Sequence, residues 1–278
     1  MREQLLRVLD QHYPEVPILL AGSHAIGKET ADSDVDLLIF TDAVQVPVIT
    51  YREVDGFKLE AIELPKRNVL YFLERTANES GAYLFMVAMG TILRDQDGYL
   101  AELKTWGDSR FLAGPPTVKQ QYKANRLLRE ISNQLTDLEG RKKASEKLFA
   151  ANELINDLTS LLFLINNLWP MGGKWKDRKL SPLYPGVFER LFEAFRQAMS
   201  TADYTEMVAI VDELIAPLGG RKDHYSSHLS GEHPLDAGMV KIILPGVVLT
   251  DLDQLAVRQL QALRASYPLL YLNDFEDG

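Results

Sequence analysis

The sequence of 278 residues contains no cysteine. Disulfides, thiol nucleophiles and thiolate metal sites are therefore excluded. Histidine is also scarce, with five residues, and no HExxH motif is present. His224 and His228 have the four-residue spacing of a helical metal pair, but no further ligand lies near them in the sequence. We therefore do not expect a zinc site.

Long apolar runs are missing as well. No run approaches the roughly 20 residues that a membrane-spanning helix needs. The first residues, MREQLLRVLDQHY, have the pattern of an amphipathic helix and lack the apolar core of a signal peptide. These features favour a cytoplasmic location. The absence of a GxxxxGK[ST] motif argues against a P-loop kinase.

Positive charge is in deficit, because the sequence has 30 Lys and Arg residues and 39 Asp and Glu residues, which gives a net charge of −9. Residues 1–113 carry −7 of this charge and residues 114–278 carry −2. Broad nucleic-acid binding requires a cationic surface, so this balance argues against it. It suits a cationic small-molecule acceptor or an ordinary enzyme.

The most informative segment that is present is residues 18–40, ILLAGSHAIGKETADSDVDLLIF. An apolar run meets Gly22-Ser23, and a second apolar run begins around Asp34 and Asp36. Residues two apart in a strand project from the same face, so these two carboxylates are expected to point the same way. Paired carboxylates bind hard divalent cations such as Mg²⁺. The turn, if it leads into a helix, offers free N–H groups to phosphate.

This pattern resembles the nucleotidyltransferase superfamily of DNA polymerase beta and the antibiotic adenylyltransferases. The matching residues are Gly22 and Ser23, then a spacer that ends at Ser33, then Asp34-Val35-Asp36. The resemblance implies that Gly22, Ser23 and Ser33 contact the nucleotide. Ile26 stands where related sequences often have arginine, so Lys28 is predicted to help neutralise the phosphates.

A third carboxylate is expected on a neighbouring strand. Asp55-Gly56, between two β-rich runs, predicts a hairpin turn. On the returning strand, residues 57–64, we predict that Glu60 faces the site, as the third acidic residue does in the superfamily. Glu63 is the alternative, at the end of the strand and on its opposite face. A third interpretation is that Glu60 is only a solvated strand residue.

The resemblance implies a mechanism based on one or two Mg²⁺ ions held by Asp34, Asp36 and Glu60. ATP or another nucleoside triphosphate is the expected substrate. Glu60 is expected either to bind a second metal ion or to act as general base towards an acceptor hydroxyl.

The sequence predicts an α+β protein with two domains. Residues 1–113 read as helix, strands and further helices around a small mixed sheet, including a strand over 91–94 and a short helix over 99–106. Gly114-Pro115-Pro116 marks the predicted boundary, and residues 114–278 read as mainly helical and acceptor-binding. The strongest helix is expected over 145–168.

The second domain contains one basic segment. Residues 169–185 are predicted to form a loop in which Lys174 and Lys176 either bind the triphosphate or are simply solvated. On the helix before it, Glu153 and Asp157 share a face, and ordinary surface acids are the favoured interpretation of this pair.

We therefore expect an Mg²⁺-dependent enzyme that transfers a nucleoside monophosphate, AMP from ATP, to a hydroxyl of a small molecule such as an aminoglycoside-like antibiotic. A tRNA or protein acceptor, as in toxin–antitoxin nucleotidyltransferases, is the second hypothesis. A catalytically silent nucleotide-binding scaffold is the third.

Overall fold

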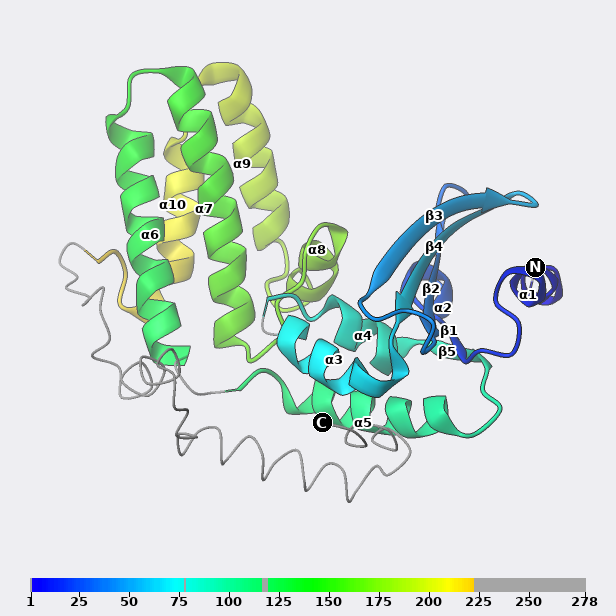
Figure 1. Ribbon diagram of the computed structural model, residues 1–278. Helices are drawn as coiled ribbons and strands as arrows, with labels where there is room; N and C mark the ends of the chain where they lie inside the picture. Colours follow the sequence, from blue (N-terminus) through cyan, green and yellow to red (C-terminus); the bar gives the residue numbers. More distant parts are fainter. Residues whose placement is uncertain (1, 78, 117–119, 223–278) are drawn as a thin grey trace, which may run out of the picture. The chain divides into compact units, whose positions relative to one another are not determined.

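The computed structural model describes residues 2–77, 79–116 and 120–222 (Figure 1). They form two units, each with its own core: residues up to 77 together with 83–113 make the first unit, and residues 79–82 together with 114–222 make the second. His224 and His228 lie outside the described residues.

A five-stranded mixed sheet organises the first unit, with the strand order β3-β4-β2-β1-β5. Strands β2 and β4 run parallel, and the other neighbouring pairs are antiparallel. The strands are β1 (Ile18–Leu20), β2 (Val35–Phe40), β3 (Val48–Val54), β4 (Phe57–Leu64) and β5 (Thr91–Arg94). The last of these has the bounds that the sequence predicts.

Helices cover both faces of this sheet (Figure 1). The helices of the unit are α1 (Arg2–His12), the short α2 (Gly22–Ala25), α3 (Val69–Ala77), α4 (Ala82–Met89) and α5 (Tyr99–Ala113), with a 3-10 turn, η1, at Lys66–Asn68. Helix α5 is longer than predicted, because the ring of Phe111 near its end packs 5.6 Å from the ring of Phe85 on α4.

Alternation of side chains along the strands divides the core in two. On one face, leucines of α1 pack against alternate residues of β2 and β4, among them Leu37 and Ala61. On the other face, helices α3 to α5 cover the intervening residues, and the ring of Phe40 lies 5.8 Å from that of Tyr99 at the start of α5. Burial of both faces explains why β2 is apolar over most of its length.

The β3–β4 hairpin turns at Asp55 and Gly56, which both have positive φ (49° and 80°). Two central residues of positive φ match the twist of the flanking strands, which is why Asp-Gly is favoured at this turn. The turn sets the register, so that Val54 pairs with Phe57 and, further from the turn, Tyr51 pairs with Glu60.

The second unit contains helices and no strand among its described residues. Its helices are α6 (Gln120–Gly140), α7 (Ala144–Ile165), α8 (Lys174–Leu180), α9 (Val187–Thr201) and α10 (Thr205–Ile215), followed by a 3-10 turn, η2, at Ala216–Leu218. Helices α6 and α7 form the most extensive pair, and α10 contacts both α6 and α9. The predicted α+β class is confirmed.

Helix α7 is the one described helix that is long and apolar enough to cross a membrane by length and composition alone. The core helix of a globular protein passes the same test. In this unit Leu154, Leu158, Leu161 and Leu162 of α7 are buried. Packing in the helical core therefore accounts for its composition.

The structure corrects one detail of the predicted second domain. Residues 174–180, expected in a loop, form helix α8. Gly173, with φ +52°, precedes it, and the aliphatic side chain of Leu180 is buried at its end. A single buried side chain in a basic segment produces no helical repeat of apolar residues. The sequence of this segment therefore indicates a solvated loop.

Candidate active site

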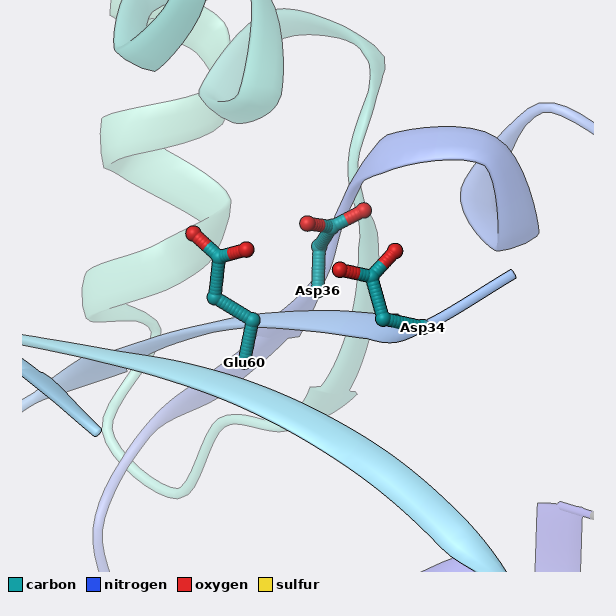
Figure 2. A group of neighbouring side chains, drawn as sticks. All are labelled: Asp34, Asp36 and Glu60. Atoms are coloured by element: carbon teal, nitrogen blue, oxygen red, sulfur yellow. The ribbon is translucent and has the colours of Figure 1, made fainter. Parts of the chain in front are cut away.

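Three carboxylates converge on the face of the sheet opposite α1. One carboxylate oxygen each from Asp34, Asp36 and Glu60 lies within 4.8 Å of the other two, and all three residues are half-buried. Figure 2 shows the three side chains rising from adjacent strands towards one region. A cluster of this size and composition could hold a divalent cation, because oxygen ligands suit hard ions.

Strand pairing places the three residues. Asp34 immediately precedes β2 and Asp36 is its second residue, so both project from the same face. Strand β4 is the parallel neighbour of β2, and Asp36 pairs with Glu60 in its register. Directly opposed residues of neighbouring strands point to the same face, so the third carboxylate joins the pair without any contribution from a loop.

The electrostatics of the three carboxylates favour a bound cation. Burial raises the pKa of Glu60, and the negative charges of Asp36 and Asp34 raise it further. Like charges brought this close disfavour ionisation unless a cation or donor balances them. The three residues therefore fit a divalent cation in both ligand chemistry and charge.

Gly22 is packed directly against this cluster. Its φ is +61°, and a β-carbon at this position would lie 1.6 Å from Oδ2 of Asp36. The amide of Ala21 donates to the carbonyl oxygen of Asp36 (2.8 Å), which extends the β1–β2 pairing to the turn. No residue with a side chain fits this position without displacing the Asp36 carboxylate.

Ser23 follows in the four-residue helix α2 and is buried, with 2% of its surface exposed. Its hydroxyl oxygen has no hydrogen-bond partner among the described residues. A buried hydroxyl without a partner is costly, so it is a natural contact for a bound ligand.

The loop after α2 turns back on itself. The amide of Lys28 donates to the carbonyl oxygen of Ser23 (2.9 Å), and the amide of Thr30 donates to Oγ of Ser33 (2.9 Å). Lys28 is exposed and Ser33 is half-buried. In the structure Ser33 therefore closes the loop that leads into Asp34, and its predicted contact with a nucleotide stays a prediction.

Comparison with known proteins identifies the fold of this unit. Residues 2–79 match the family model described as a nucleotidyltransferase domain. The first unit is a nucleotidyltransferase domain. The match spans all three carboxylates and the Gly-Ser turn, and the predicted membership of the DNA polymerase beta-like superfamily is confirmed. The match covers residues 2–79 and leaves the residues after them outside it.

Other comparisons add little. A crystal structure titled as a nucleotidyltransferase-like protein from Exiguobacterium sibiricum 255-15 aligns with 97% of this chain and 89% of its own. The sequence identity is 16% and the TM-score is 0.41, so this likeness carries no argument about function. No curated protein matches the chain.

The structure distinguishes the two glutamates of β4 in the nucleotidyltransferase domain. Glu63 lies on the α1 face, where its charge contributes, after burial, to raising the pKa of Tyr13. Glu60 lies on the other face with Asp34 and Asp36. Glu63 is thus separated from the carboxylate group by the sheet itself.

Two tyrosines beside the carboxylates were not singled out from the sequence. Tyr51 of β3 pairs with Glu60 in the register, and the negative charge of Glu60 raises the pKa of the Tyr51 hydroxyl. Tyr83 of α4 lies close enough that the charge of Glu60, after burial, raises its pKa. The sequence did contain a signal for Tyr51, because the Asp55-Gly56 turn fixes which residue faces Glu60.

The remaining predicted residues belong to the second unit. Lys174 is exposed at the start of α8, whereas Lys176 is half-buried and donates to Oδ1 of Asn156 (2.8 Å). Burial lowers the pKa of Lys176. Asp157 accepts a hydrogen bond from Gln134 (2.7 Å) and Glu153 is exposed, which agrees with their interpretation as ordinary helix residues.

Proposed function

We propose that this protein is an Mg²⁺-dependent nucleotidyltransferase that transfers AMP from ATP to a hydroxyl group of a small molecule, with release of pyrophosphate. The observation that carries the proposal is the convergence of three carboxylates beside Gly22 within a nucleotidyltransferase domain. A cytoplasmic location is part of the same proposal.

Asp34, Asp36 and Glu60 would hold the cation. Bound Mg²⁺ supplies positive charge that stabilises the charge developing on the phosphates during transfer. The three residues would keep the cation on the sheet surface, and Glu60 would serve either as a ligand or as the base that accepts the proton of the attacking hydroxyl. In the metal-free protein, burial and the charges of Asp36 and Asp34 raise the pKa of Glu60.

Gly22 and Ser23 are the proposed contacts for the phosphate chain, together with Lys28 and Ser33. The support for Ser23 is its buried hydroxyl, which has no hydrogen-bond partner in the part of the chain that the structure describes. A small-molecule acceptor is favoured over tRNA by the net charge of −9, since RNA binding requires a cationic surface.

The test uses ATP labelled at the α- or the γ-phosphate, incubated with the full-length protein, Mg²⁺ and separate pools of aminoglycosides, tRNA and cell protein. We expect α-label, and no γ-label, on the aminoglycoside pool. Transfer to tRNA or protein would contradict the proposed acceptor, and γ-label on any acceptor would contradict nucleotidyl transfer.

A matched pair of variants controls this assay. Asp36→Asn is expected to lower the rate by about 10³-fold, since the cation is worth several kcal/mol to the transition state. Asp32→Asn makes the same chemical change at an exposed loop residue and should leave the rate unchanged. Equal rates for the two variants would remove the carboxylates from the mechanism.

A further inference from the structure

A row of three side chains crosses the sheet at the candidate site. Tyr51 on β3 pairs with Glu60 on β4, and Glu60 pairs with Asp36 on β2. Directly paired residues share a face, so all three side chains lie on the face that carries the carboxylates. Gly22 contacts Asp36 from the β1 side, so the row has the Gly-Ser turn at one end and Tyr51 at the other.

Tyr51 contributes little to the core. Tyr51 is 70% exposed and lies on β3, at the edge of the sheet. Its hydroxyl is nevertheless within the influence of the site, because Tyr51 is paired with Glu60 and the negative charge of Glu60 raises the pKa of the hydroxyl. The charges of Asp34 and Asp36 also act on it, so the hydroxyl lies near the whole carboxylate group.

Glu60 needs such a partner. Its side chain has more rotatable bonds than the aspartates, and the charges of Asp36 and Asp34 repel it. Repulsion alone favours rotamers that point away from the aspartates, and such rotamers would open the cation site. A hydrogen-bond donor on the β3 side restricts Glu60 without adding a positive charge that would compete with the cation.

We propose that Tyr51 is a positioning residue, whose hydroxyl holds the Glu60 carboxylate in place beside Asp34 and Asp36 and so completes the cation site. This inference rests on the proposed function, because it requires Glu60 to be a ligand of the cation. It adds a residue that lies outside the Gly-Ser and Asp-x-Asp motifs, and it makes the exposed β3 strand part of the site.

The test is calorimetric titration of the full-length protein with Mn²⁺, which replaces Mg²⁺ at oxygen sites. Tyr51→Phe removes only the hydroxyl, and we expect it to weaken Mn²⁺ binding about fivefold, as for loss of one ordinary hydrogen bond. The melting temperature without metal should not change. Tyr71→Phe is the matched control, because Tyr71 is a similarly exposed tyrosine (67%) on α3.

A double-mutant cycle separates positioning from a general effect on the fold. If Tyr51 acts through Glu60, then Tyr51→Phe has no further effect once Glu60→Gln is present. A spectroscopic measurement gives the same information independently. The luminescence lifetimes of bound Tb³⁺ in H₂O and D₂O report its coordinated water, and both Tyr51→Phe and Glu60→Gln should add water where the carboxylate is lost.

The outcomes distinguish the inference from the proposed function. If the wild-type protein binds no Mn²⁺, the cation site and the inference fail together. If the wild type binds Mn²⁺ and Tyr51→Phe binds it equally well, only the inference fails. An equal loss from Tyr51→Phe with and without Glu60→Gln also overturns it, because Tyr51 would then act by another route.

Discussion

Gly22 combines a positive φ with contact to the Asp36 carboxylate, and the two requirements can be tested separately. Gly22→Ala should destabilise the protein by about 1–3 kcal/mol, from backbone strain and from the clash with Oδ2. Because the clash displaces a ligand, Mn²⁺ binding should also be lost. Urea unfolding and calorimetry measure the two effects.

Gly27→Ala is the control for backbone strain alone. Gly27 has a similar φ of +64°, and a β-carbon there would meet nothing within 4 Å. This variant should lose stability, by about 1 kcal/mol, and keep its Mn²⁺ affinity. Loss of metal binding in both variants would show that loop strain, and not contact with Asp36, controls the site.

Glu60 makes the stability of the metal-free protein dependent on pH. Burial, Asp36 and Asp34 raise its pKa in the folded state above the ordinary value of 4.5. The folded protein therefore binds the proton more tightly than the unfolded chain does. Its stability falls as the pH rises from about 4.5 through the raised folded pKa.

Glu60→Gln should remove this loss of folding stability at high pH. In EDTA at pH 8 the variant should unfold at a higher urea concentration than the wild type, and the advantage should shrink towards pH 4. Saturating Mg²⁺ should reverse the order, because only the wild type retains all three ligands. Glu53→Gln, at an exposed residue of β3, should show none of these differences. A pH-independent advantage for Glu60→Gln would contradict the electrostatic explanation.

At the scale of elements, helix α8 presents half-buried positive charge. Burial lowers the pKa of Lys176, so its ammonium group reduces stability at neutral pH. Lys176→Met should therefore leave the melting temperature unchanged or raise it. If the predicted contact with the triphosphate exists, the same variant raises the KM for ATP about tenfold, as for loss of one charged contact.

The control for α8 is Lys142→Met, at an exposed lysine that precedes α7. It should change neither the melting temperature nor the KM. A Lys176→Met variant with normal KM would restrict the role of this lysine to its hydrogen bond with Asn156.

Elements differ in how well the sequence predicts them. Strong local signals predicted the Asp55-Gly56 hairpin and β5, because turn chemistry and alternation act over a few residues. The contact between Gly22 and Asp36 could not be predicted in this way, because it depends on the pairing of β1 with β2. Helix α8 was missed because its apolar anchoring is confined to its last residue.

In the candidate site, too, local patterns predicted some residues and not others. The two-residue spacing of Asp34 and Asp36 predicts that they share a face of the strand, and the structure places Glu60 beside them. Their catalytic role stays a prediction. The position of Tyr51 opposite Glu60 could have been predicted by counting residues back from the hairpin turn. The position of Tyr83 could not, because it depends on how helix α4 packs, which no local pattern specifies.

At the scale of the whole molecule, the two units have separate cores, and hydrogen exchange can locate each ligand. Mg²⁺ alone should slow amide exchange in β2, β4 and α2, because bound cation stabilises the state that holds the three carboxylates together. Adding a nonhydrolysable ATP analogue should extend protection to α8 if Lys174 and Lys176 contact the nucleotide. Protection of α8 by Mg²⁺ alone would contradict the assignment of the cation to the first unit.

If Asp36 and Glu60 bind Mg²⁺ as proposed, their pairing across parallel strands links the amount of folded protein to the supply of the metal in a cell. An unfolded chain does not hold these ligands together, so the free energy of cation binding adds directly to the free energy of folding. Scarcity of magnesium would then reduce the amount of intact enzyme as well as the turnover of each molecule. The amount of folded protein and its activity would therefore decline together when magnesium is scarce.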